Sequence, residues 1–317
     1  MNKIFNLIIT TAIKTNSSDI HFEENSNNTD ILFRQYGSIK KGTSLENTKG
    51  NIINYIVYKA NLDVLNNYNL NTGMIHYEYE NRIINLRISL ISNNMQRSIV
   101  IRVINNHKKI LINKLCFLKN NSDNIKKIIY MDSGLILICG KTGSGKTTTL
   151  YSLIEELKKS KRVVTVENPI ERNIDGITQI DLSKKKISSS IALMQILRHD
   201  PDVIVYGEIR NQDELKNVVH AALSGHLVIS TMHAINSKHV ISKIKSLEIP
   251  ADEIYAVLNL ILYQQIFYTK NNNPTIVLEK IEANEIEKIL NNEIVNIASI
   301  QDQISHYIKR GDLYKGK

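Results

Sequence analysis

The chain has 317 residues, and its 40 Lys and Arg against 31 Asp and Glu give a formal net charge of +9. A chain of this length can form two ordinary domains, each with its own hydrophobic core. Its only cysteines, Cys116 and Cys139, form no CxxC pair. This argues against a disulfide framework and against a zinc site, and it favours a reducing, cytoplasmic setting.

The amino terminus has an apolar stretch that invites comparison with a signal peptide. This stretch is short, is broken by Thr10 and Thr11, and lacks a small-residue cleavage site. Ile4, Leu7 and Ile8 instead recur at helical spacing. No other segment reaches the roughly 20 uninterrupted apolar residues of a membrane-spanning helix. We therefore expect any work at a membrane to go through a partner.

Residues 1–104 predict a smaller α+β domain. After the first helix, short runs alternate between apolar and polar residues, which is typical of strands in an antiparallel sheet. These runs are Asp19 to Phe22, Ile31 to Gln35, Met74 to Tyr79, Ile83 to Ile91 and Ser98 to Ile104. The following segment, 105–124, is polar and rich in Asn and Lys, and we predict it to be the inter-domain linker.

Residues 125–317 predict an α/β domain. Continuous apolar runs of four or five residues are separated by longer segments with helical periodicity, a pattern typical of a parallel sheet covered on both faces. The runs are Leu135 to Cys139, Val163 to Val166, Val203 to Tyr206 and Leu227 to Ser230. After His233 we expect a mainly helical carboxyl-terminal part, with a long helix over Ala251 to Tyr268 and one extra strand over Thr275 to Ile281.

Residues 140–147 read GKTGSGKT and match the P-loop pattern GxxxxGK[ST] in full. An apolar strand precedes them and an amphipathic helix follows, so backbone amides and the helix dipole face a bound phosphate. Lys146 supplies a positive charge, and the hydroxyl of Thr147 is placed to bind Mg²⁺. The predicted ATP-binding residues are Gly140, Lys141, Thr142, Gly143, Ser144, Gly145, Lys146, Thr147 and Thr148.

Acidic side chains follow two of the predicted strands. Glu167 and Glu171 lie around Pro169, which ends one strand, and Glu208 closes a run that resembles a Walker B element with Gly207 where an Asp is common. We predict that Glu171 orients or deprotonates the attacking water, that Glu208 belongs to the magnesium shell, and that Glu167 supports them. The alternative is that these carboxylates cap helices or lie on the surface.

Basic side chains bracket two of the strands. Arg198 and Arg210 lie on either side of the second acidic strand, and His226 and His233 lie on either side of Leu227 to Ser230. A lone His is more often a structural residue than a phosphate sensor. Because both strands lie beside the predicted nucleotide, we expect all four side chains at the site.

The motifs resemble those of the type II secretion and type IV pilus assembly ATPase superfamily, over nearly the whole chain. Residues 17–23 read SSDIHFE, 140–151 read GKTGSGKTTTLY and 165–171 read TVENPIE. Residues 197–210 read LRHDPDVIVYGEIR, and 221–233 read AALSGHLVISTMH. The compact size is most similar to that of the competence-pilus assembly ATPases of Gram-positive bacteria.

The resemblance implies a RecA-like P-loop ATPase domain behind a PAS-like amino-terminal domain. It implies a homo-hexamer that uses ATP and Mg²⁺, lies in the cytoplasm at the face of the cell membrane, and drives a polytopic inner-membrane platform protein. The implied work is assembly of a pilus-like filament, used in competence for DNA uptake. Arg87 and Arg102 stand at positions resembling the arginines that this family presents to nucleotide.

The sequence departs from the family pattern at three places. The family's Glu-Asp-Pro is Glu167-Asn168-Pro169 here, so one acidic group is missing and more weight falls on Glu171. The paired CxxC zinc site of the larger members cannot form. Residues 263–265 read YQQ where the family often has a Gln-Arg pair, which leaves the role of that predicted helix open.

Two alternatives stay open. A retraction-type pilus ATPase would use the same chemistry for the opposite stroke, although residues 17–23 suit the assembly branch. A nucleic-acid-bound P-loop switch protein is suggested by the basic charge. That reading requires a basic stripe with aromatics, whereas the lysines are scattered in pairs and triplets and Trp is absent. We therefore expect no direct nucleic-acid contact.

Overall fold

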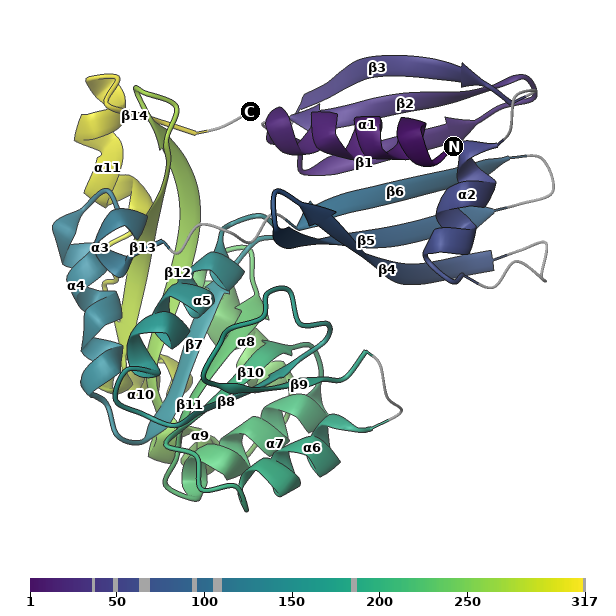
Figure 1. The fold of residues 1–317 in the computed structure, drawn as a ribbon. Helices are drawn as coiled ribbons and strands as arrows, with labels where there is room; N and C mark the ends of the chain where they lie inside the picture. The colour runs from purple at the N-terminus through teal and green to yellow at the C-terminus, as the bar shows by residue number, and fades with distance from the viewer. Residues whose placement is uncertain are drawn as a thin grey trace. The chain divides into compact units, whose positions relative to one another are not determined.

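A computed structural model describes residues 1–35, 38–47, 51–62, 69–92, 96–104, 110–183 and 187–315. The chain divides into two compact units, Met1–His107 and Lys108–Lys315 (Figure 1). Within the described ranges, no helix is long and apolar enough to cross a membrane.

The first unit is an antiparallel sheet with two helices. Its strands pair in the order β3-β2-β1-β6-β5-β4, and every predicted strand of this unit is present. β3 was not predicted, because nearly all of its side chains are exposed and show no alternation. The elements are α1 (Asn2–Lys14), β1 (Asp19–Glu24), β2 (Asn28–Gln35), β3 (Ser38–Glu46), α2 (Ile52–Lys59), β4 (Asn69–Tyr79), β5 (Arg82–Ser92) and β6 (Arg97–Ile104).

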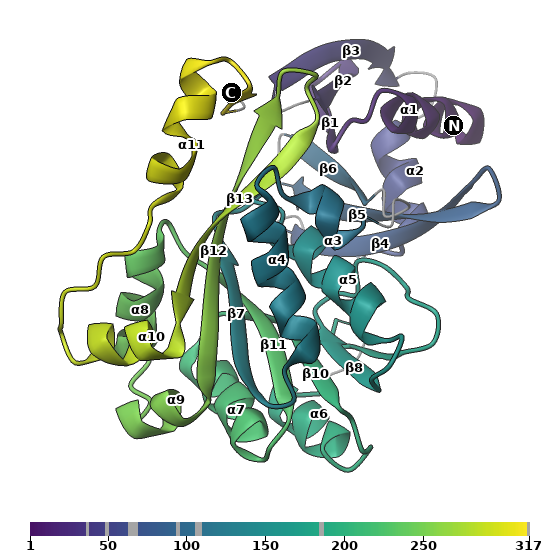
Figure 2. The same ribbon diagram turned by 90° about the vertical axis from the view of Figure 1, so that its left-hand side faces the viewer.

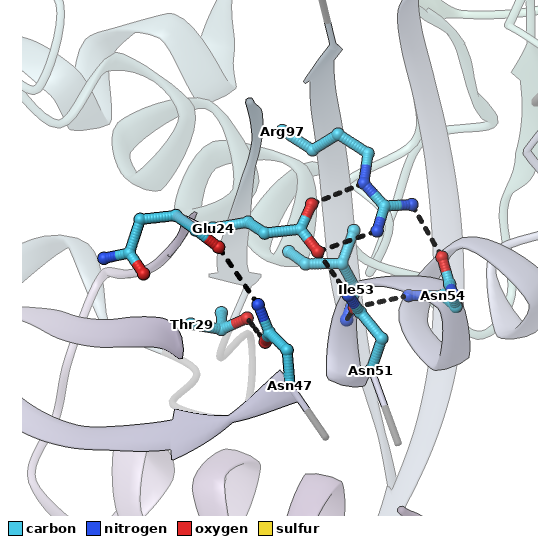
Figure 3. Close-up of polar contacts among 8 residues, drawn as sticks. Glu24, Thr29, Asn47, Asn51, Ile53, Asn54 and Arg97 are labelled. Carbon is cyan, nitrogen blue, oxygen red and sulfur yellow. Dashed lines mark hydrogen bonds and ion pairs between the residues drawn. The ribbon is translucent and has the colours of Figure 1, made fainter. Parts of the chain in front are cut away.

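Both helices pack on one face of this sheet, where Phe5 and Ile53 are fully buried (Figure 1). A polar cluster fixes the start of α2 (Figure 3). Arg97 donates from Nε and Nη2 to the carboxylate of Glu24, at 2.5 and 2.8 Å, and from Nη1 to Asn54 at 2.6 Å. Asn51 caps α2 and also donates to Glu24. The cluster therefore ties α2 to β1 and β6.

The second unit contains a sheet in the order β13-β12-β7-β11-β10-β8-β9, and β14 also pairs with β12. Neighbours from β12 to β9 run parallel, whereas β13 and β14 are antiparallel to β12. The strands are β7 (Gly134–Gly140), β8 (Val163–Glu167), β9 (Thr178–Asp181), β10 (Val203–Ile209), β11 (Leu227–His233), β12 (Leu258–Thr269), β13 (Pro274–Glu282) and β14 (Leu313–Tyr314).

Helices cover both faces of this sheet, as the continuous apolar strands predicted (Figure 2). One face packs against α3 (Ile112–Leu115), α4 (Lys119–Lys127), the 3₁₀ turn η2 (Ile128–Tyr130) and α5 (Lys146–Leu157). The other packs against α6 (Ser189–Ile196), α7 (Gln212–Leu223), α8 (Ser237–Ser246), α9 (Ala251–Val257), α10 (Ala283–Leu290) and α11 (Ile300–Lys309). The α/β prediction for this unit is confirmed.

Two predictions about the second unit need correction. Residues 105–109 lie outside the described residues, but much of 110–124 forms α3 and the start of α4, and Ile112 and Leu115 are buried in this unit. This part of the chain is therefore not a linker.

The long helix expected over Ala251 to Tyr268 ends at Val257, and β12 follows. The prediction failed because a continuous apolar run fits a strand buried on both faces as well as it fits a helix. The carboxyl-terminal part therefore contains both strands and helices.

Candidate nucleotide-binding site

The P-loop connects β7 to α5, as predicted. Gly143 and Gly145 have φ of +78° and +85°, in the left-handed region that favours glycine. No side chain caps the amino terminus of α5, where Gly145 is the N-cap residue. The backbone amides in the first turn of α5 are therefore available to an anion, and the helix dipole favours an anion at this end of the helix.

Lys146 lies across this loop. Its Nζ donates to the backbone oxygens of Gly140 and Lys141, at 3.0 and 3.1 Å. Burial lowers the pKa of Lys146, while the charges of Glu208 and Glu171 act to raise it. Two of the three predicted acidic side chains, Glu208 and Glu171, therefore lie close enough to act electrostatically on the P-loop lysine.

The carboxyl ends of β10 and β11 meet the P-loop edge of the sheet. His233 pairs with Gly140 in the β11–β7 register. Glu208 accepts a hydrogen bond from Nε of Arg210 at 2.7 Å. A Cβ at Gly207 would lie 3.3 Å from the backbone oxygen of Val166, so the strands approach closely at the position where a Walker B element commonly has an Asp. The sheet thus brings three predicted side chains to this edge.

The carboxylate of Glu167 is buried and held by three donors: Tyr151 OH, Thr165 Oγ1 at 2.6 Å and Gln179 Nε2 at 3.0 Å. Tyr151 OH in turn accepts from the backbone N–H of Glu171, at 3.2 Å. Burial raises the pKa of Tyr151, which keeps its phenol protonated and able to donate. Glu167 therefore anchors the loop that carries Glu171, and its supporting role in catalysis stays a prediction.

Sequence reasoning missed Tyr151, although it lies four residues after Thr147 on the same helix face. Tyr151→Phe is expected to lower the free energy of unfolding by about 1–3 kcal/mol, because Glu167 and two backbone amides lose a buried partner. Chemical denaturation measures this, and ATP turnover should fall as the Glu171 loop loosens. Tyr255→Phe, which removes an exposed bond to Asn291, is the control and should change neither. Equal effects of the two substitutions would contradict the proposed anchor.

The predicted placements of His226 and Arg198 are wrong. Gly134, at the start of β7, donates its N–H to the backbone oxygen of His226 at 3.1 Å. A strand of seven residues spans about 20 Å, so His226 lies at the sheet edge opposite the P-loop. Arg198 likewise precedes the amino end of β10, whereas Arg210 follows its carboxyl end. Residues that bracket one strand lie at opposite edges, which the sequence interpretation overlooked.

Arg87 and Arg102 belong to the first unit, where they lie directly opposite each other on β5 and β6. Nε of Arg102 donates to Asp19 at 2.8 Å, and the side chain of Arg102 is 59% exposed.

In the part of the chain that the structure describes, no three His, Cys, Asp or Glu side chains form a metal-binding group.

A complete P-loop at the carboxyl edge of a parallel sheet defines a P-loop nucleotide-binding fold. Residues 1–305 match the model of the family described as "Type II/IV secretion system protein". The chain therefore belongs to this family, and the predicted resemblance is confirmed.

Relatives of both kinds named by the resemblance are found. The type II secretion system ATPase E of Vibrio cholerae is 32% identical over 84% of this chain and 54% of the relative. Competence protein ComGA of Bacillus subtilis is 29% identical over 84% of this chain and 76% of the relative. The chain thus spans about half the length of the type II secretion relatives that it matches.

Two solved structures share the fold. The Legionella pneumophila ATPase DotB has a TM-score of 0.78 at 20% identity and covers 98% of this chain and 93% of its own. The pilus retraction motor PilT with bound ADP has a TM-score of 0.72 at 21% identity, and covers 97% and 93%.

Proposed function

We propose that this chain is an ATP-hydrolysing motor subunit. The observation that carries the proposal is the complete P-loop with Lys146 laid across it, where the charges of Glu208 and Glu171 act on that lysine. The name of the Vibrio cholerae relative, an ATPase, supports the same reading. Turnover of ATP by the purified chain, dependent on Mg²⁺, tests it.

Each group has a separate task in this proposal. The amides of α5 and Lys146 bind the β- and γ-phosphates. The hydroxyl of Thr147 and the carboxylate of Glu208 fit Mg²⁺, which prefers oxygen ligands and neutralises phosphate charge when bound. Glu171 orients the attacking water, and Arg210 and His233 lie where further phosphate contacts form.

The finer assignments follow the family. We propose that the first unit is PAS-like, that the second is RecA-like, and that the chain forms a homo-hexamer. Its partner is a polytopic inner-membrane platform protein, reached from the cytoplasmic face of the membrane, and its product is a competence-type pilus. The match to 76% of the Bacillus subtilis competence protein supports this choice. Mass measurement with and without nucleotide tests the hexamer.

The retraction motor is the second candidate, because the chain shares the fold of PilT. A deletion strain distinguishes them. Loss of an assembly motor leaves no pili, whereas loss of a retraction motor leaves too many.

Glu208→Gln is expected to bind ATP and fail to hydrolyse it, because the amide keeps the size of the side chain and loses the charge that completes the magnesium shell. Binding and turnover are measured separately, with fluorescent nucleotide and phosphate release. Glu171→Gln should also lose turnover. If Glu171→Gln is active while Glu167→Gln is stable and inactive, the roles of Glu171 and Glu167 must be exchanged.

A further inference from the structure

Strand β12 continues past the end of β7 and flanks the P-loop. Its pairing with β7 ends at Tyr263 opposite Cys139, and the next residue is Gln264. The side chain of Gln264 is fully buried. Its Nε2 donates to the backbone oxygen of Ser144 at 2.7 Å, and its Oε1 accepts from Thr149 Oγ1 at 3.0 Å. One amide therefore joins β12 to both the P-loop and the first turns of α5.

The hydrogen bond from Gln264 to the C=O of Ser144 fixes the orientation of the peptide between Ser144 and Gly145. That orientation decides whether the loop presents an N–H or a C=O to a bound phosphate. In a trans peptide the C=O and the following N–H point to opposite sides. Because Gln264 holds the C=O of Ser144 toward β12, the N–H of Gly145 points to the other side. Phosphate needs N–H groups, not carbonyl oxygens, on the inner side of the loop.

The packing around this contact is close. A Cβ at Gly140 would lie 2.6 Å from the backbone oxygen of Gln264, and one at Gly145 would lie 3.3 Å from Ile266 on the same strand. The contact needs one uncharged side chain that donates to Ser144 and also accepts from Thr149. The amide of glutamine carries both a donor and an acceptor. The fit leaves little room for the loop to change shape on this side.

We propose that Gln264 is a positioning residue, which holds the P-loop with its amides directed at phosphate and links that geometry to the β12–β13 hairpin. This inference rests on the proposed function, because it assumes that the loop binds a nucleotide. The competing account is that Gln264 is a buried polar contact that stabilises the fold and nothing else.

Gln264→Leu separates these accounts when it is compared with Gln303→Leu. Gln303, on α11, also donates to backbone oxygens, those of Leu278 and Ala298, and accepts from Asn121. Both substitutions should lower Tm. Gln264→Leu should also weaken the binding of fluorescent ADP by about ten-fold or more, since one hydrogen bond no longer orients the loop. Gln303→Leu should bind ADP like the unchanged chain.

Gln264→Glu provides a second test that does not depend on the leucine variant folding. A protonated carboxyl group keeps both hydrogen bonds, whereas a carboxylate loses the donor and adds a negative charge beside the phosphates. Burial raises the pKa of a carboxyl group, so the protonated form is present below that raised value. Relative to the unchanged chain, ADP affinity should be near normal at low pH and fall as pH rises.

The inference is overturned if Gln264→Leu binds ADP within about two-fold of the unchanged chain, or if the relative affinity of Gln264→Glu does not change with pH. Failure of the unchanged chain to bind ADP has a different meaning. That result rejects the proposed function, and this inference with it.

Discussion

Lys146→Ala is expected to abolish ATP turnover. The ammonium group of Lys146 neutralises the charge on the β- and γ-phosphates both before and during phosphoryl transfer. Removal of one well-placed donor to a developing negative charge typically costs about 10²–10³ in kcat. Loss of a full positive charge should cost at least as much, and phosphate release measures it. Nucleotide binding should weaken as well.

The fold should survive this substitution. In the structure Nζ of Lys146 donates to the backbone oxygens of Gly140 and Lys141 within the loop itself. Lys159→Ala is the matched control, since it also removes one lysine close to α5. The side chain of Lys159 is 63% exposed and pairs with Glu156. A Lys146→Ala chain with near-normal hydrolysis would show that the P-loop is not the working site.

Local signals predicted the centre of this molecule well. The P-loop is contiguous, so eight residues and their flanking apolar strand and helix identify it without knowledge of the rest of the fold. The strands β7, β8, β10 and β11 are buried on both faces, and their continuous apolar runs are hard to mistake when helical segments alternate with them. The acidic side chains Glu208 and Glu171 were selected because they stand at or just after the ends of these strands, and their roles stay predictions.

Features that depend on distant parts of the chain were not predicted. Gln264 lies 120 residues from Ser144 in the sequence, and nothing near Gln264 indicates its partner. The stretch from Leu258 to Tyr268 reads as helix or strand by composition, and pairing with β7 and β13 decides between them. His226 was misplaced for a related reason, because the two ends of a strand are close in sequence and far apart in space.

Substitution of Arg87 or Arg102 is the second change that we expect to cause a large loss of ATP turnover. Directly opposed like charges destabilise a sheet, yet these two arginines face each other on an exposed face of β5 and β6. Asp19, opposite Arg102 on β1, is paired with one of them. An anion placed between the two guanidinium groups would offset this repulsion, and we propose that the anion is the γ-phosphate of ATP bound by a neighbouring subunit.

Arg87→Ala and Arg102→Ala should therefore cut turnover by about 10³–10⁵, the range known for an arginine that screens the transferred phosphate. Arg82→Ala is the control, because Arg82 is exposed at the start of the same strand β5. Exposed ion pairs contribute only about 0–1 kcal/mol to stability, and charges that meet no ligand do not act on the transferred phosphate. If both arginines lie on a solvated surface, all three variants should therefore stay folded and equally active. Circular dichroism checks that each variant is folded.

Mixed rings test whether the arginine acts across a subunit interface. An Arg102→Ala subunit lacks the arginine and keeps its P-loop, while a Lys146→Ala subunit keeps the arginine and lacks a working P-loop. Each variant alone should be inactive. When the two are mixed, some interfaces join an intact P-loop to an intact arginine, so part of the activity should return. If rings shown by mass measurement to contain both variants stay inactive at every mixing ratio, Arg102 does not act in trans.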